Sequence, residues 1–371
     1  MRVLLATGIF YPDVGGPATH VRKIAEHFSG LGWGVTVVAF GERPSDEVVP
    51  YRVVRTSRNM PKLVSWLVYA FTVMREAARS DVVYAFDLTT AGMPAAASAA
   101  LWRKRFIVRI GGDPIWEREA EAGRRLIPMD EYYMKGLYMQ DRPRLYRVLR
   151  RVVRSADRIV VYNQRFKDFY VTYFGAHPSN VTVVKNPVLP KETSSRESDT
   201  RTCIFAGRFV AYKNLERVIK AAAKSFPKYP NARLLFVGDG PERGALETLA
   251  EQLGVPLTIR PKTNQKSLFQ MIRGSSVALA PALSEFNPNF ILESLSLGKP
   301  ALISKNHGLS VDVPDMMEFD PMDVDSLAAA FDRILSDDGY AKAEAAVHSL
   351  PLDWRWDDVL SSQESIVRSM L

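Results

Sequence analysis

The sequence has very little cysteine: Cys203 is the single one among 371 residues. One thiol cannot build a disulfide framework or a multi-thiolate metal site, which excludes the small disulfide-stapled and zinc-ribbon classes. We therefore expect a protein of a reducing compartment, with a cytoplasmic location. The five histidines show none of the short spacings of metal ligands, so we expect no protein-built metal site.

Long hydrophobic runs are also missing. The two longest apolar stretches, Leu63–Met74 and Ala91–Trp102, have about a dozen residues each, which is too short to cross a bilayer and suits buried helices. The first residues do not have the pattern of a secretory signal. Hydrophobic residues make up 47% of the chain and charged residues 24%, which excludes a disordered chain. The length predicts two domains.

Several catalytic fingerprints are absent from the sequence. There is no G-x-G-x-x-G pattern, no P-loop and no G-x-S-x-G elbow. Dinucleotide-dependent, P-loop and serine-hydrolase chemistry therefore have no support.

Positive charge is concentrated in one block. Residues 101–173 hold 17 Lys and Arg against 9 Asp and Glu, which accounts for the whole net charge of +8. Such a block fits an anionic membrane surface, a phosphorylated substrate or nucleic acid. A solvated helix face is the alternative.

Short apolar runs alternate with amphipathic stretches along most of the chain. Runs that are apolar on both faces and alternate with helices are typical of parallel strands. The predicted strands are 3–7, 35–40, 82–86, 106–110, 159–162, 181–184, 202–206, 234–237, 257–259, 277–280 and 301–304. The predicted helices of the first half are 17–31, 62–79, 91–102, 130–156 and 164–174.

A polar segment without periodicity, residues 189–202, interrupts this rhythm and reads as a linker. The sequence thus predicts an α/β protein with two Rossmann-like, doubly wound parallel-sheet domains, 1–190 and 191–352. Ligands of such sheets bind beyond the carboxyl ends of the strands, so we expect the site in a central cleft that the two domains face.

The segment SEFNPNFILESLSLGKP, residues 284–300, predicts a helix with Asn287 as its N-cap and Pro288 in its first position. Its first backbone amides would bind phosphate with the positive end of the helix dipole; they belong to Asn289, Phe290 and Ile291. Glu285 and Glu293, eight residues apart, could reach two parts of one ligand. Alternatively, both are ordinary surface glutamates.

The segment CIFAGRFVAYKNL places Arg208 and Lys213 between a strand and a helix that begins near Leu215. Two cations at the carboxyl end of a strand can form a diphosphate clamp. A pair of solvated loop charges is the alternative.

Two further segments follow predicted strands. In PDVGGP, Gly15 and Gly16 let the backbone approach a ligand closely, although a tight turn would need them equally. In FIVRIGGDPIW, Asp113 could orient a sugar hydroxyl, or it could merely cap the turn before Pro114.

Taken in order and spacing, four segments of the chain resemble the retaining, nucleotide-sugar-dependent glycosyltransferases of family 4, which have the GT-B architecture. They are the GGP loop, GRFVAYKNLERVIKAA, LLFVGDGPE and VALAPALSEFNPNFILESLSLGKPALI. The resemblance covers nearly the whole chain. It implies a metal-independent hexosyltransferase without a cofactor, whose co-substrate is a nucleotide-diphosphate sugar.

The resemblance also implies roles for residues. Arg208 and Lys213 would hold the two phosphates with the amides of 289–291, Glu293 would bond the ribose, and Glu285 would contact the transferred sugar. Gly15 and Gly16 would close over the phosphates. Asp113 stands where many relatives carry a histidine, and Glu285-Phe-Asn-Pro stands where they usually have Glu-Gly-Phe-Gly. The catalytic residues that the resemblance implies are Asp113, Arg208, Lys213 and Glu285.

The resemblance implies an acceptor on the N-terminal domain: a glycan, or a polyprenyl-diphosphate-linked or other lipid acceptor at the cytoplasmic face of a membrane, as in polysaccharide biosynthesis. The basic block 101–173 would face the anionic lipid. The last helix, 353–371, would cross back onto the N-terminal domain. The alternatives are a sugar-phosphate synthase or nucleotide-sugar epimerase of the same fold, a dehydrogenase, and a non-catalytic nucleic-acid-binding protein.

Overall fold

A computed structural model describes residues 1–13, 16–42, 48–191, 201–305 and 307–370. The chain divides into two compact units. The first unit comprises Met1–Ile115, Tyr138–Asn186 and Trp356–Leu371, and the second comprises Trp116–Leu137 and Pro187–Arg355. Residues 116–137 thus lie within the predicted N-terminal domain of 1–190 but group with the second unit, because their helices α4 (Trp116–Glu121) and α5 (Met129–Met134) pack on it.

The first unit contains a seven-stranded parallel sheet in the order β3-β2-β1-β4-β5-β6-β7. Its central strands β1, β4 and β5 are buried on both faces, and apolar residues fill nearly all of their positions. The strands are β1 (Arg2–Ala6), β2 (Gly34–Phe40), β3 (Arg52–Thr56), β4 (Val82–Ala85), β5 (Arg105–Arg109), β6 (Arg158–Val161) and β7 (Val181–Val183).

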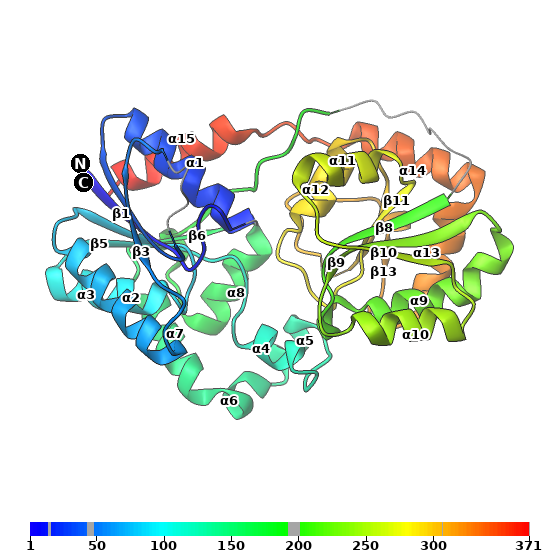
Figure 1. Ribbon diagram of the computed structural model, residues 1–371, viewed down its shortest axis with the longest axis horizontal. Coiled ribbons are helices and arrows are strands. Elements are labelled where there is room, and N and C mark those ends of the chain that lie inside the picture. The colour runs from blue at the N-terminus through cyan, green and yellow to red at the C-terminus, as the bar shows by residue number, and fades with distance from the viewer. Residues whose placement is uncertain (14–15, 43–47, 192–200, 306, 371) are drawn as a thin grey trace. The chain divides into compact units, whose positions relative to one another are not determined.

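Helices cover both faces of the first sheet. Helices α1 and α15 pack together over one face, and α2, α3 and α7 pack over the other (Figure 1). The phenol of Tyr84 in β4 donates a hydrogen bond of 2.6 Å to Oε1 of Gln363, which ties α15 to this sheet. The helices are α1 (Gly16–Gly30), α2 (Lys62–Ala77), α3 (Gly92–Trp102), α6 (Leu137–Asp141), α7 (Pro143–Ser155), α8 (Gln164–Phe174), α15 (Trp356–Arg368) and the 3₁₀ turn η1 (Pro178–Asn180).

The second unit contains a six-stranded parallel sheet in the order β10-β9-β8-β11-β12-β13. Helices α9 and α10 lie on one face, and α11 and α12 lie on the other (Figure 1). Its strands are β8 (Arg201–Arg208), β9 (Ala232–Asp239), β10 (Leu257–Arg260), β11 (Val277–Ala280), β12 (Ala301–Ser304) and β13 (Glu318–Phe319). Its helices are α4 (Trp116–Glu121), α5 (Met129–Met134), α9 (Leu215–Ser225), α10 (Arg243–Gln252), α11 (Gln265–Arg273), α12 (Asn289–Ser296), α13 (Val324–Leu335), α14 (Asp337–Ser349) and the 3₁₀ turns η2 (Ala211–Lys213), η3 (Phe226–Lys228) and η4 (Asp315–Met317).

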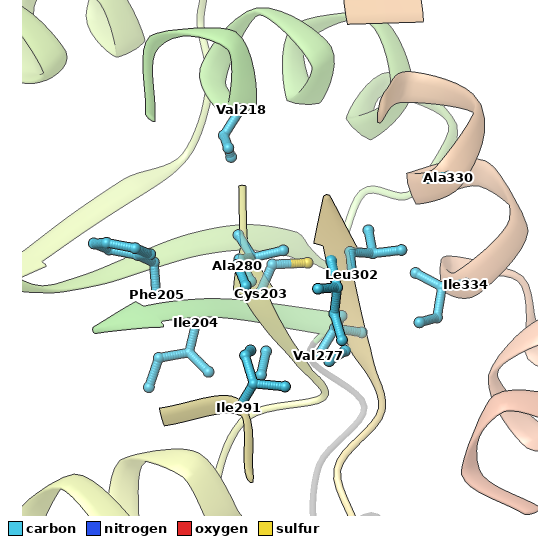
Figure 2. Close-up of a cluster of buried hydrophobic side chains, with 14 of the residues drawn as sticks. Cys203, Ile204, Phe205, Val218, Val277, Ala280, Ile291, Leu302, Ala330 and Ile334 are labelled. Atoms are coloured by element: carbon cyan, nitrogen blue, oxygen red, sulfur yellow. The ribbon is translucent and has the colours of Figure 1, made fainter. Parts of the chain in front are cut away.

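Successive side chains of β8 point to opposite faces of this sheet, so the strand contributes to the core on both faces. Figure 2 shows Ile204 with Ile291 of α12 on one face and Phe205 on the side of Val218 of α9. The single cysteine, Cys203, is fully buried in the same cluster. Burial raises the pKa of its thiol, so this side chain acts as a small apolar core residue.

Two glycines bring the end of β9 against the loop after β8. Gly238 has φ +147°, and a Cβ there would lie 1.9 Å from the carbonyl oxygen of Gly207. A Cβ on Gly240 would lie 2.3 Å from the carbonyl oxygen of Phe209. A side chain at either position would collide with backbone, so the GDG sequence fixes the course of the chain on both sides of Arg208.

The predicted α/β class, with two doubly wound parallel sheets, is confirmed, and all eleven predicted strands are present. Strands β3 and β13 were not predicted, because β3 reads RVVRT with a charge near each end and β13 has only two residues. The single helix predicted over 130–156 is wrong: Gly136, with φ +66°, and Pro143 divide it into α5, α6 and α7. None of the described helices has the length and apolar content needed to cross a membrane.

Candidate active site

The predicted donor-site residues of the second unit gather at the point where its strand order reverses. From β8 the chain runs outward through β9 and β10, and then returns to the other side of β8 with β11. At such a switch point the loops after the two central strands diverge, and ligands of open parallel sheets bind there. Here the two loops are joined, because the Leu283 N–H donates to the Tyr212 carbonyl oxygen at 2.9 Å.

Lys213 and Glu285 contact each other directly. Lys213 ends η2 after β8, Glu285 lies in the loop after β11, and Nζ to Oε1 is 2.5 Å. The two side chains are only 17% and 11% exposed, so little water screens the pair. The Lys213 ammonium also lies 5.2 Å from the centre of the Tyr212 ring. The sequence places both residues at this edge, but not as partners.

Arg208, at the end of β8, lies at the same edge. Its Nη1 donates to Oε1 of Glu121 at 2.8 Å, and the guanidinium side chain is 69% exposed. Glu121 belongs to α4, far earlier in the chain. Both cations of the predicted diphosphate clamp are therefore paired with carboxylates of the same unit.

The segment 116–137 forms a wall beside these residues. The Trp116 ring meets the Tyr212 ring edge-on at 5.3 Å and the Phe286 ring at 6.0 Å. The Met129 N–H donates to Oγ of Ser284 at 2.9 Å. The sequence does not reveal this contribution, because nothing local in WEREAE indicates that it packs against a loop some hundred residues later.

Tyr212 contacts both Trp116 of this segment and Lys213. Burial raises the pKa of its phenol well above the usual range, and the carboxylates of Glu117, Glu285 and Glu121 raise it further. The phenol therefore stays protonated at any working pH and can donate a hydrogen bond to an oxygen of a ligand.

Helix α12 begins one residue later than predicted. Its first residue is Asn289 and its N-cap is Pro288, which has no side-chain donor or acceptor. Asn287 is not the N-cap: it has φ +72° and is 3% exposed. Neither polar atom of its amide has a hydrogen-bond partner in the described part of the chain.

One of the three predicted phosphate-binding amides is already engaged. The Ile291 N–H donates to the Pro288 carbonyl oxygen at 3.0 Å, in the first turn of α12. This corrects the prediction that the amide of Ile291 is free for a ligand. Asn289 and Phe290 lie in the same turn, which carries the positive end of the helix dipole.

Glu293 lies in α12 and contacts the start of α11. Its Oε1 accepts a hydrogen bond of 3.1 Å from Nε2 of Gln265, the first residue of α11. Burial raises the pKa of Glu293 above its ordinary value of 4.5, and the Gln265 bond opposes that shift. Because this carboxylate is partly desolvated, hydrogen bonds from hydroxyl groups of a ligand would stabilise its charged form.

The remaining predicted residues belong to the first unit. Asp113 follows β5, is fully buried, and accepts a hydrogen bond of 3.1 Å from the Ile115 N–H, as an aspartate that caps a turn does. Gly16 starts α1, and its carbonyl oxygen accepts from Nδ1 of His20, which is neutral because burial lowers its pKa to about 3. Gly15 lies outside the described residues.

Metal-ligating side chains do not cluster within the ranges that the structure describes: no group of three or more His, Cys, Asp or Glu residues could hold a metal ion.

Two family descriptions match the chain, one for each half. Residues 14–192 match Glycosyltransferase Family 4, and residues 190–347 match Glycosyl transferases group 1. Among curated relatives, an uncharacterized glycosyltransferase of Methanocaldococcus jannaschii is 23% identical over 404 residues, which cover 99% of this chain and 98% of the relative.

Solved structures share the fold at low identity. Sucrose-phosphate synthase from Thermosynechococcus elongatus superposes with a TM-score of 0.77 at 17% identity, covering 100% of this chain and 98% of that one. The Anabaena protein HepE, solved in complex with UDP and glucose, gives a TM-score of 0.75 at 15% identity and covers 100% of both chains. The family matches confirm the resemblance to group 1 and family 4 glycosyltransferases, and the solved structures confirm the GT-B architecture.

Proposed function

Because this chain belongs to the group 1, family 4 glycosyltransferases with the GT-B fold, we propose that it moves a sugar from a nucleotide-diphosphate sugar to an acceptor hydroxyl with retention of configuration. The observation that carries the proposal is the pairing of Arg208 and Lys213 with carboxylates at the switch point of the second sheet. Carboxylate and phosphate oxygens pair with these cations in the same way, so in the proposed complex a phosphate oxygen replaces each carboxylate on its cation.

In the proposed complex Arg208 and Lys213 hold the two phosphates. Binding releases Glu121 from Arg208 and Glu285 from Lys213, so that Glu285 becomes available to hydroxyls of the transferred sugar. The first turn of α12, through the amides of Asn289 and Phe290, adds the positive end of a helix dipole. Glu293 accepts hydrogen bonds from the ribose hydroxyls.

The charges match the proposed reaction. When the bond between the sugar and the diphosphate breaks, positive charge develops on the ring and negative charge develops on the leaving diphosphate. Two fixed cations and a helix N-terminus stabilise the leaving group with groups of the chain itself. The acceptor oxygen bonds to the anomeric carbon on the face that the diphosphate leaves, and the acceptor proton passes to the leaving phosphate oxygen.

We assign the acceptor to the first unit, which holds most of the basic block 101–173. A glycan or a polyprenyl-diphosphate-linked or other lipid acceptor fits this charge, and the proposed location is the cytoplasmic face of a membrane. Asp113 is proposed to orient an acceptor or donor hydroxyl from the end of β5, and Gly15 and Gly16 to approach the phosphates.

A thermal-shift screen against UDP-, GDP- and ADP-sugars tests the donor assignment. A ligand at 100 times its Kd stabilises the native state by about 2.7 kcal/mol, so the cognate donor is expected to raise Tm clearly. NAD serves as the control for a dehydrogenase. A shift with NAD and none with any nucleotide sugar would refute the proposal.

Glu293→Gln is expected to stabilise the protein increasingly as pH rises above about 4.5, the ordinary pKa of this carboxyl. The pKa of Glu293 is higher in the folded protein than in the unfolded chain. Its contribution to stability is therefore complete at pH values below its pKa in the unfolded chain, and is lost as pH rises through its pKa in the folded protein. Glutamine does not titrate. Urea unfolding at pH 4 and pH 7 measures this change.

The same variant is expected to bind the donor nucleotide roughly tenfold more weakly, because a neutral amide replaces a charged acceptor for the ribose hydroxyls. Isothermal titration with the nucleotide from the screen measures the affinity. Glu247→Gln, in the exposed Arg243–Glu247 pair of α10, is the matched control. A stability difference independent of pH, or an unchanged affinity, would contradict the corresponding part of this prediction.

A further inference from the structure

Helices α2, α3 and α7 of the first unit enclose an apolar groove of about 680 Å³ on the outside of the sheet. Trp66, Phe71 and Met74 of α2, Met93 and Leu101 of α3, and Val148 of α7 contribute to its lining. The two cations proposed to hold the diphosphate, Arg208 and Lys213, are in the other unit. We propose that this face docks on an anionic lipid bilayer.

The first observation is the outward face of α2. Its inward residues Ser65, Tyr69 and Val73 are buried, as in any helix packed on a sheet. Its outward face is also apolar: Leu63 is 69% exposed, Leu67 53% and Phe71 60%, one turn apart along the helix. Proteins that stay in water rarely expose a patch of this kind.

The patch extends beyond this row. Val64 and Val68 form a second exposed row on α2, and Leu101 and Trp102 are exposed at the end of α3. The Trp102 indole N–H donates to the Met74 carbonyl oxygen at 3.0 Å, which holds the two helices together at this end. Tryptophan at the rim of an apolar patch is typical of a membrane interface.

The second observation is the charge on α7, which reads PRLYRVLRRVVRS and contains no acidic residue. Its five arginines are exposed, and none forms an ion pair with another residue in the ranges described. Four of them recur at spacings of three and four residues, which places them on one helical face: Arg144, Arg147, Arg151 and Arg154. Arg151 itself lines the groove.

An anionic bilayer matches both observations at once. Apolar side chains of α2 and α3 would enter the boundary between headgroups and acyl chains, and the α7 arginines would pair with lipid phosphates. A second copy of the chain fits less well, because two such copies would bring two unpaired arginine rows into one interface, where like charges repel. The basic block and the apolar patch thus have one partner.

Vesicle sedimentation tests this surface, with vesicles of phosphatidylcholine alone and with 30% phosphatidylglycerol. We expect the unaltered protein to bind the anionic vesicles and to bind the neutral ones at least tenfold more weakly, with binding reduced by salt. Leu67→Glu/Phe71→Glu is expected to abolish sedimentation. Arg147→Gln/Arg151→Gln is expected to lower the partition coefficient on the order of 10- to 30-fold.

Leu253→Glu, at an exposed leucine of the second unit, is the matched control and should sediment like the unaltered protein. Equal binding to neutral and anionic vesicles, or unchanged binding of the α2 variant, overturns the proposal. So does light scattering that shows a dimer which this variant converts to a monomer. Because no substrate is present, the result is independent of the proposed sugar transfer.

Discussion

Arg208→Ala is expected to lower kcat about 10²- to 10³-fold, the usual loss when one preorganised group that stabilises developing charge is removed. The arginine side chain is 69% exposed and is held by one ion pair with Glu121. Exposed pairs contribute about 0 to 1 kcal/mol to stability, so Tm should fall by no more than a few degrees. The loss of activity would therefore report on the reaction and not on folding.

Initial rates with the donor identified by thermal shift measure this effect. Lys224→Ala is the matched control, since Lys224 is an exposed cation of the same unit, paired with Asp325, in the last turn of α9. Helix α9 starts beside the site and ends at the opposite edge of the sheet. If Arg208→Ala turns over as fast as Lys224→Ala, Arg208 does not hold the diphosphate.

Lys213→Met is expected to lose both turnover and stability. The loss of kcat should again be at least about 100-fold, because the variant lacks the ammonium group that stabilises the leaving diphosphate. Unlike Arg208, Lys213 has a largely buried partner, so its removal leaves the Glu285 carboxylate without its cation. Breaking a buried pair costs 3 to 5 kcal/mol, and we expect about 2 to 3 kcal/mol here because both side chains keep some exposure.

The double variant Lys213→Met/Glu285→Gln separates the two losses. A neutral glutamine needs no cation, so urea unfolding should show recovery of much of the stability. Turnover should stay as low as in Lys213→Met. Recovery of turnover together with stability would mean that Lys213 acts only by neutralising Glu285.

The sequence predicts most of the fold because continuous aliphatic runs such as Val277–Ala280 are an unambiguous signal of buried parallel strands. Alternation with amphipathic helices then fixes the doubly wound class. Because β8 and β11 are neighbouring parallel strands, the loops after them lie at the same edge of the sheet, and Lys213 and Glu285 do meet there. Strand β3 lacks this apolar signal, since an edge strand does not need to be apolar on both faces.

The rest of the candidate site depends on contacts between distant parts of the chain. No pattern near Glu121 indicates that it pairs with Arg208, 87 positions later. The left-handed backbone of Asn287 likewise follows from the packing of its loop, whereas its residue type alone suggests a helix cap. Local propensity identifies which residues are available, and tertiary packing decides how they are used.

The passage of residues 116–137 into the second unit has a consequence for how such enzymes could be recombined. A donor module cut from the gene at residue 187 would arrive without Trp116 and Glu121, and Arg208 and Tyr212 would lose their neighbours. Exchange of sugar specificity between relatives therefore requires two separate stretches of coding sequence to travel together. Chimaeras that carry only the segment from residue 187 onward should be less stable, and those that also carry residues 116–137 should regain that stability.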